Sequence, residues 1–224
     1  MERKIIKTAD GSVTIHLPEW DEQYHSKHGA VQEAQHVFIK MGLHHFLKQN
    51  LKPQISILEI GFGTGLNAFI TFLEVQKLPL QFKYTGVEAY PVTSEEIAAL
   101  NYAENLSAEK ENWALQKMHD SPWEKPLQIS ANFCLLKLQQ KFDKINSKDE
   151  FDIIYFDAFG ARVQPELWTE EIFKIMYAAL KKEGILVTYS AKGSVRRALQ
   201  SVGFIVERLP GPPGKREMLR ATKN

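Results

Sequence analysis

The chain has 224 residues, of which 44% are hydrophobic and 25% are charged, and its formal net charge is +1 at pH 7. These values are typical of one globular domain with a sizeable core. The sequence contains no apolar run of membrane-spanning length, and no long apolar segment follows the N-terminal Met-Glu-Arg-Lys. Cys134 is the only cysteine, which excludes an internal disulfide. We therefore expect a cytoplasmic protein without a signal peptide.

The first 50 residues predict a β-hairpin followed by a helix. Two β-prone runs flank Asp10-Gly11, a dipeptide typical of a tight hairpin turn. Residues 18–29 are predicted as a loop, in which His25 and His28 have no third partner at a metal-ligand spacing, so we expect no metal. Residues 30–48 predict a helix whose buried side would carry Val31, Ala34, Phe38, Met41 and Leu47. We expect residues 1–50 to pack as an extension on the domain formed by residues 51–224.

Three glycines at alternate positions, Gly61, Gly63 and Gly65, follow an apolar run at residues 55–60. The run predicts a buried strand, and helical spacing resumes after the glycines. Such a turn lets the backbone approach a ligand at a helix N-terminus. The dinucleotide fingerprint has its third glycine where this chain has Leu66, which disfavours a dinucleotide oxidoreductase. The pattern E-x-G-x-G-x-G from Glu59 is the usual form in S-adenosylmethionine-dependent methyltransferases, and a purely structural turn is the alternative.

Two further acidic residues end predicted parallel strands. Residues 81–88 predict a strand that ends in Glu88, where doubly wound folds place an acid that accepts hydrogen bonds from ribose hydroxyls. An ordinary solvated glutamate is the alternative. Residues 150–157 are almost continuously apolar and predict a central strand that ends in Asp157. Ligands bind at the carboxyl ends of such strands, so we expect Asp157 at the binding edge.

The remaining elements complete an α/β pattern. Helices are predicted at 94–105 and 108–118, and a third strand at 133–138 carries Cys134 as a packed thiol. After a helix from Thr169 come a strand at 184–190, a helix at 194–201 and a strand pair at 204–209 and 216–221. Strands that alternate with helices until a final strand pair predict a mostly parallel, seven-stranded sheet with an antiparallel edge.

Charge is distributed unevenly along the chain. Residues 1–180 hold 18 Lys and Arg against 24 Asp and Glu, whereas residues 181–224 hold 10 against 3. A localised basic patch suits a polyanion such as RNA. A solvated basic face is the alternative.

Several separated motifs together resemble one family, the methyltransferases that complete 5-methylaminomethyl-2-thiouridine at the tRNA wobble position (MnmC/MnmD type). The blocks, in chain order, are Tyr24-His-Ser with Gly29, Glu33 and residues 36–38; residues 59–67; Asp157-Ala-Phe159 with residues 165–168; residues 188–199 with Gly203-Phe204; and residues 211–219. The family usually continues Phe-Ala-Pro after the acid, whereas this chain has Phe159-Gly160-Ala161. No second glycine fingerprint for a flavin-dependent oxidase half is present. The chain therefore resembles the stand-alone methyltransferase form.

The resemblance implies a Rossmann-like class I fold for residues 51–224, with S-adenosyl-L-methionine as cofactor and tRNA as partner. The cofactor would be bound by Glu59, Gly61, Phe62, Gly63, Thr64, Gly65, Asn67, Glu88, Ala89, Gln139 and Asp157. Gln139 stands where these enzymes often carry an acid that contacts adenine. Asp157 would also be catalytic, orienting the acceptor amine and receiving its proton.

The same resemblance implies contacts with the anticodon stem-loop through Tyr24, Glu33, Phe159, Trp168, Lys192, Arg196, Arg197, Lys215 and Arg216. Phe159, Trp168 and Tyr90 are candidates to stack on the uracil or the adenine, and core packing is the alternative for Phe159 and Trp168. Two other functions stay open from the sequence. One is a small-molecule amine methyltransferase or aminopropyltransferase of the same fold, and the other is a non-catalytic RNA-binding module.

Overall fold

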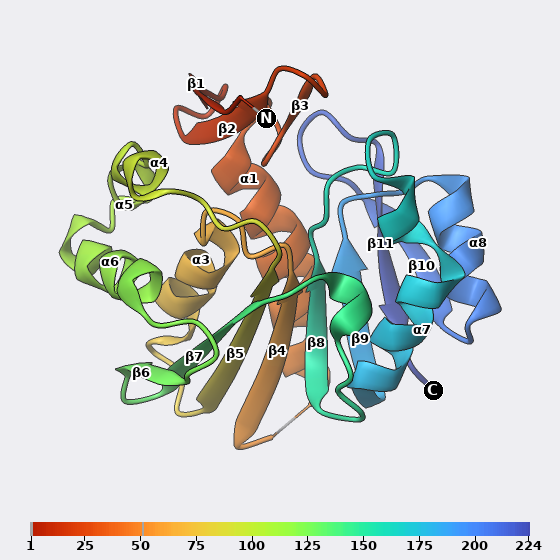
Figure 1. The fold of residues 1–224 in the computed structure, drawn as a ribbon. Coiled ribbons are helices and arrows are strands. Elements are labelled where there is room, and N and C mark those ends of the chain that lie inside the picture. Colours follow the sequence, from red (N-terminus) through yellow and green to blue (C-terminus); the bar gives the residue numbers. More distant parts are fainter. Residues whose placement is uncertain (1, 51) are drawn as a thin grey trace.

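The computed structural model describes residues 2–50 and 52–224, and a large twisted sheet forms its centre (Figure 1). The strand order is β10-β11-β9-β8-β4-β5-β7-β6. The five inner strands are parallel: β4 (Gln54–Ile60), β5 (Gln81–Glu88), β7 (Phe133–Gln139), β8 (Phe151–Phe156) and β9 (Leu180–Thr188). At one edge β11 (Glu217–Thr222) and β10 (Ile205–Pro210) add in antiparallel orientation. The predicted mostly parallel α/β fold is therefore confirmed.

The sheet has eight strands, one more than the seven predicted. The additional strand, β6 (Leu127–Ser130), pairs antiparallel with β7 at the opposite edge, through an irregular register. Its four residues, Leu-Gln-Ile-Ser, do alternate between apolar and polar side chains, but a run of this length is only a weak signal for a strand. Such a short edge strand is fixed by its partner strand, not by its own sequence.

Successive residues of the inner strands enter two hydrophobic clusters, one on each face of the sheet. In β8, for example, Ile153 and Tyr155 join one cluster and Ile154 and Phe156 the other. The first cluster also contains residues of α3 (Leu66–Val75) and α6 (Asn112–Asp120). The second contains residues of α7 (Glu170–Ala179) and α8 (Gly193–Ser201). Burial on both faces explains why these strands are almost continuously apolar.

The predicted N-terminal helix is present, but its middle turns are π-helical. It consists of α1 (Ala30–Ala34), the π-helix η1 (Gln35–Leu43) and α2 (His44–Gln49). The wider π spacing buries Val37, Phe38 and Ile39 in succession, while Met41 and Leu47 are only partly buried. All five residues predicted for the buried side are buried or pack against the core, but the α-helical period did not indicate that Val37 and Ile39 are buried as well.

The predicted hairpin is part of a three-stranded sheet, β1 (Lys4–Lys7), β2 (Val13–Leu17) and β3 (Glu22–Gln23). This sheet interrupts the helix predicted at 94–105, which is divided into α4 (Ser94–Ala98) and α5 (Tyr102–Asn105). Asn101 lies in the break, where its Oδ1 accepts from the Val13 amide and its Nδ2 donates to the Gly11 carbonyl. Between these helices and α7 lie three short 3₁₀ turns: η2 (Glu109–Glu111), η3 (Phe142–Lys144) and η4 (Pro165–Trp168).

Within residues 2–50 and 52–224, no helix is both long and apolar enough to cross a membrane. The same residues contain no group of three or more His, Cys, Asp or Glu side chains arranged to hold a metal ion. His25 lies beside Thr14, with 3.1 Å between its Nδ1 and the Thr14 Oγ1, whereas His28 is exposed.

Candidate active site

A cavity of about 1400 Å³ lies at the carboxyl ends of β4, β5 and β8, and we call it the cleft. The sheet contributes Gly61, Glu88 and Asp157 to its lining, while Tyr24 and Glu33 come from the first 50 residues. In Figure 1 the small N-terminal sheet lies at the top, above the same end of the large sheet from which the loop after β8 emerges. The N-terminal extension is therefore one wall of the cleft.

The glycine turn lies at the base of the cleft. Gly61, Gly63 and Gly65 have φ values of +87°, +48° and +73°, in the region that side chains disfavour. The amides of Gly61 and Phe62 both donate to the Val87 carbonyl, at 3.0 and 3.1 Å. A Cβ on Gly61 would lie 2.7 Å from the Asp157 carbonyl oxygen. The turn therefore requires glycine in order to approach both neighbouring strand ends.

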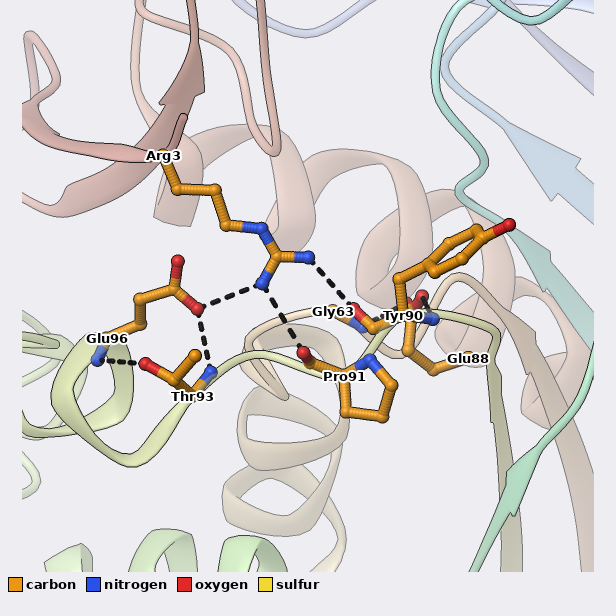
Figure 2. Close-up of polar contacts among 7 residues, drawn as sticks. All are labelled: Arg3, Gly63, Glu88, Tyr90, Pro91, Thr93 and Glu96. Atoms are coloured by element: carbon orange, nitrogen blue, oxygen red, sulfur yellow. Dashed lines mark hydrogen bonds and ion pairs between the residues drawn. The ribbon is translucent and has the colours of Figure 1, made fainter. Parts of the chain in front are cut away.

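Glu88 connects the turn to the loop that follows β5 (Figure 2). Its Oε2 accepts from the Gly63 amide at 3.0 Å, and its Oε1 accepts from the Tyr90 amide at 2.9 Å. Each carboxylate oxygen has a second acceptor site, so Glu88 can also accept from two hydroxyls. The carboxylate is both a structural link and an open acceptor within the cleft.

Arg3 fixes the same loop from the N-terminal extension, as Figure 2 shows. Its Nη2 donates to the Tyr90 carbonyl at 3.0 Å, and its Nη1 donates to the Pro91 carbonyl at 3.3 Å and pairs with Glu96 at 3.0 Å. Glu96 in turn completes the capping box of Thr93 at the start of α4. Sequence analysis missed Arg3, because its partners lie 87 to 93 residues away along the chain.

We expect Arg3→Met to lower about fivefold the affinity for the cofactor that the resemblance implies, because the loop that holds Glu88 loses three contacts to a charged group. The maximal rate should change little. Calorimetric titration with S-adenosylhomocysteine measures the affinity. Lys4→Met, which removes an exposed neighbouring cation, is the matched control. Equal affinities of the two variants would contradict a positioning role for Arg3.

Asn67 joins two acidic side chains beneath the cleft. Its Nδ2 donates to the Glu59 Oε1 at 2.9 Å and to the Asp157 Oδ2 at 2.8 Å. Glu59 is 0% exposed, and burial raises its pKa well above the usual value. Among the described residues, the Asn67 Oδ1 and the Glu59 Oε2 are buried without a hydrogen-bond partner. Asn67 and Asp157 line the cleft, but Glu59 does not. Glu59 therefore contributes to the site by holding the Asn67 side chain in position.

The pKa of Asp157 is raised from 3.8 to about 7. Burial is the largest cause, and the negative charge of Glu33 adds to it. The hydrogen bond from Asn67 and the positive charge of Lys215 act in the opposite direction. A carboxyl group with this pKa can accept and release a proton near neutral pH.

Aromatic side chains form another part of the cleft lining. Phe159 contacts Tyr24 and Trp20 edge to face, with ring centroids 5.0 and 5.9 Å apart. Trp168 is only 5% exposed, and its Nε1 donates to the Phe159 carbonyl at 2.7 Å. The suggestion that Trp168 stacks on a substrate base is therefore wrong, because its ring is packed in the core against Phe156 and Tyr189. Trp168 instead holds the loop that carries Phe159.

A family model described as S-adenosyl-L-methionine-dependent methyltransferase matches residues 101–224, more than half of the chain. The chain belongs to this methyltransferase family. Its cofactor is accordingly S-adenosyl-L-methionine. The match includes β8, which ends directly before Asp157, but it begins after the glycine turn, so the turn and Glu88 support the assignment independently.

Similar proteins agree with this assignment. The chain is 29% identical over 224 residues to "tRNA 5-methylaminomethyl-2-thiouridine biosynthesis bifunctional protein MnmC" of Polaromonas naphthalenivorans, an alignment that covers 95% of this chain and 34% of the relative. The predicted resemblance is thereby confirmed. The methyltransferase chain spans about a third of the length of the curated relatives that it matches.

Two solved structures share the fold. The structure of MNMC2 from Aquifex aeolicus has a TM-score of 0.80 at 24% identity and covers all of this chain and 70% of its own. Spermidine synthase from Thermotoga maritima has a TM-score of 0.60 at 18% identity, with 99% of this chain and 69% of its own covered.

The site of the methyltransferase fits its cofactor. The turn forms a backbone cradle that a Cβ on Gly61 would fill, and the unpartnered Asn67 Oδ1 is a ready acceptor for an amino group. Glu88 lines the cleft with acceptor sites to spare, as binding of two ribose hydroxyls would require. When bound, S-adenosylmethionine supplies an electrophilic methyl group on a sulfonium.

The cleft brings together many, but not all, of the predicted site residues. Those that line it are Tyr24, Glu33, Gly61, Phe62, Gly63, Asn67, Glu88, Ala89, Asp157, Phe159, Lys192 and Lys215, and Tyr90 does so as well. Those outside its lining are Glu59, Thr64, Gly65, Gln139, Trp168, Arg196, Arg197 and Arg216. Thr64 is buried against the Tyr102 hydroxyl, and Gln139 is exposed at the end of β7. Lys141, Phe142 and Asp143, just beyond Gln139 in the chain, line the cleft, whereas Gln139 itself does not.

Proposed function

We propose that this methyltransferase methylates the primary amine of 5-aminomethyl(-2-thio)uridine at the tRNA wobble position, which gives 5-methylaminomethyl(-2-thio)uridine. The observation that carries the proposal is Asp157, a carboxyl group with a raised pKa that lies beside the glycine turn and lines the same cleft as several aromatic residues. The relatives named for biosynthesis of this nucleoside support the choice of substrate.

Asp157 has to deprotonate the acceptor before the methyl group can be transferred. An alkyl ammonium has a pKa near that of lysine, about 10.4, and only its neutral form attacks carbon. Proton transfer to a carboxylate with a pKa of about 7 is less unfavourable than transfer to an ordinary one. Asn67 holds one oxygen of Asp157, which leaves the other oxygen for the amine. Base strength and positioning therefore both contribute at this residue.

The basic residues at the C-terminal end provide the surface for the anticodon stem-loop. Lys192 and Arg197 are exposed at the start of α8, Arg196 is partly exposed beside them, and Arg216 is exposed in the loop before β11. Lys192 also lines the cleft, so this surface continues into the active site. Contacts of this kind position RNA by its phosphates without reading its sequence.

We expect the double variant Lys192→Glu/Arg197→Glu to weaken tRNA binding by about tenfold or more and to reduce the salt dependence of binding. Cofactor affinity should stay unchanged. Filter binding at several salt concentrations measures the tRNA affinity and its salt dependence. Lys110→Glu is the control for a simple change of net charge, because Lys110 belongs to η2, directly before α6 in the chain. In Figure 1, α6 lies on the opposite side of the sheet's strand order from α8. Equal losses in tRNA and cofactor affinity would instead indicate a structural role.

The direct test incubates the purified protein with S-adenosylmethionine and tRNA that carries 5-aminomethyl-type uridine. Mass spectrometry of the nucleosides should show conversion to the 5-methylaminomethyl form. Free amines such as putrescine serve as competing acceptors, which tests the small-molecule alternatives on the same fold. An unchanged nucleoside profile would overturn the proposal, and failure to bind S-adenosylmethionine would favour a non-catalytic RNA-binding module.

A further inference from the structure

A lysine side chain occupies the part of the cleft next to Asp157. The Lys215 Nζ lies 2.5 Å from the Glu33 Oε1 and 3.8 Å from the centroid of the Tyr189 ring. All three residues line the cleft with Asp157. The sequence predicted Lys215 as a phosphate contact, but its charge points inward in this structure.

The partners of this ammonium group are held by the protein. Glu33 is 8% exposed, and its second oxygen accepts from the Ser26 amide at 2.9 Å. The Tyr189 hydroxyl donates to the Ala158 carbonyl at 2.8 Å, which fixes the ring beside the strand end that carries Asp157. A buried carboxylate, an aromatic face and a second acidic group make a site suited to a primary ammonium ion.

We propose that Glu33 and Tyr189 form the subsite for the acceptor amine, and that Lys215 occupies this subsite until tRNA is bound. The inference rests on the proposed function. Lys215 and 5-aminomethyluridine carry the same group, an ammonium on a methylene carbon. The acceptor can therefore exchange with Lys215 at Glu33 without leaving that carboxylate unpaired, which would be costly.

The position of Lys215 allows this exchange. It lies in the loop between β10 and β11 next to the exposed Arg216, and its own side chain is about one-third exposed. Its ammonium can turn from Glu33 towards an RNA phosphate. Arrival of the tRNA would then clear the amine subsite, so that the site favours tRNA over free nucleosides.

The test measures binding of the nucleoside 5-aminomethyluridine by calorimetry, with S-adenosylhomocysteine present so that no reaction occurs. Lys215→Met should bind the nucleoside about fivefold more tightly, because no internal cation competes. Glu33→Gln should bind it about tenfold more weakly. Unmodified uridine, which has no amine, should bind both variants like the wild type. Arg208→Met removes an exposed cation of β10 outside the cleft and should change neither affinity.

Weaker nucleoside binding by Lys215→Met would overturn the inference, because Lys215 would then be part of the acceptor site. Unchanged binding in both variants would also overturn it while leaving the proposed function intact, provided that the wild type methylates tRNA. Affinity for S-adenosylhomocysteine and thermal unfolding confirm that each variant is folded. If Glu33→Gln does not fold, Tyr189→Leu replaces it, with the same expected loss.

Discussion

Asp157→Asn is expected to lower the rate of methyl transfer by about 10²- to 10³-fold, with cofactor affinity largely retained. An amide has the same size and can still accept the hydrogen bond from Asn67, but it cannot take a proton from the acceptor ammonium. Single-turnover methylation of tRNA measures the chemical step. A variant with a nearly normal rate would show that water or another group removes the proton.

The pH profile separates base catalysis from positioning. In the wild type the rate should rise with pH through about 7, as Asp157 becomes ionised. In Asp157→Asn the remaining activity should rise only at higher pH, where the ammonium loses its proton to solvent. If the rates of both proteins rise through the same pH range, Asp157 only positions the acceptor.

The same substitution should stabilise the fold above neutral pH. The pKa of Asp157 is higher in the folded protein, about 7, than the reference value of 3.8, so the folded state holds a proton that the unfolded chain has released. Stability is therefore lost as the pH rises through this range. Asp157→Asn should exceed the wild type by about 2 kcal/mol at pH 8 and by much less at pH 4. Thermal unfolding at the two pH values tests this. Asp143→Asn, which removes a negative charge from an exposed side chain, is the control.

Local sequence patterns indicated the glycine turn and the acidic residues at two strand ends. Gly61, Gly63 and Gly65 form a turn with positive φ values, and Glu88 and Asp157 both line the cleft. Each of these residues directly follows or ends a strand whose burial is visible in its apolar run. Topology then brings the strand ends together, because parallel strands share one carboxyl edge.

Contacts between distant side chains could not be predicted. The ion pair of Glu33 with Lys215 joins residues 182 positions apart, and the contact of Arg3 with Tyr90 spans 87. The sequence around each of these residues contains no pattern that indicates which distant residue it will contact. For Trp168 the sequence left two interpretations open, because an aromatic residue in a loop can either stack on a base or pack in the core. Only the packing of the folded chain decides between them.

The basic excess at the C-terminal end is partly internal. Arg220 is buried and pairs with Glu207 at 2.9 Å, and Lys223 pairs with Asp149 at 2.7 Å. Lys181 pairs with the fully buried Asp152 at 2.8 Å. These cations stabilise the fold and are not available to RNA in this arrangement. The surface proposed for tRNA is therefore smaller than the composition suggested, and it consists of the exposed basic residues of α8 and the loop before β11.

Gly61→Ala is expected to abolish cofactor binding and to destabilise the fold by about 3 kcal/mol. The φ of +87° is unfavourable for alanine, and the new Cβ would lie 2.7 Å from the Asp157 carbonyl oxygen. To relieve this contact the glycine turn has to separate from the end of β8, which moves Asp157 as well. Calorimetry with S-adenosylhomocysteine and thermal unfolding measure the two effects.

Gly160→Ala is the matched control, because it introduces the same methyl group three residues beyond Asp157 and gives the loop the alanine usual in the resembled family. Gly160 is not among the glycines with positive φ, and a Cβ there would meet its nearest atoms at ordinary distances of 3.6 and 3.7 Å. We expect this variant to stay within about 0.5 kcal/mol of the wild type and to bind the cofactor normally. Comparable losses in both variants would show that the loop after β8, and not the approach of the turn to Asp157, limits cofactor binding. A loss confined to Gly61→Ala would show that the cofactor turn and the catalytic carboxylate are positioned by a single backbone contact.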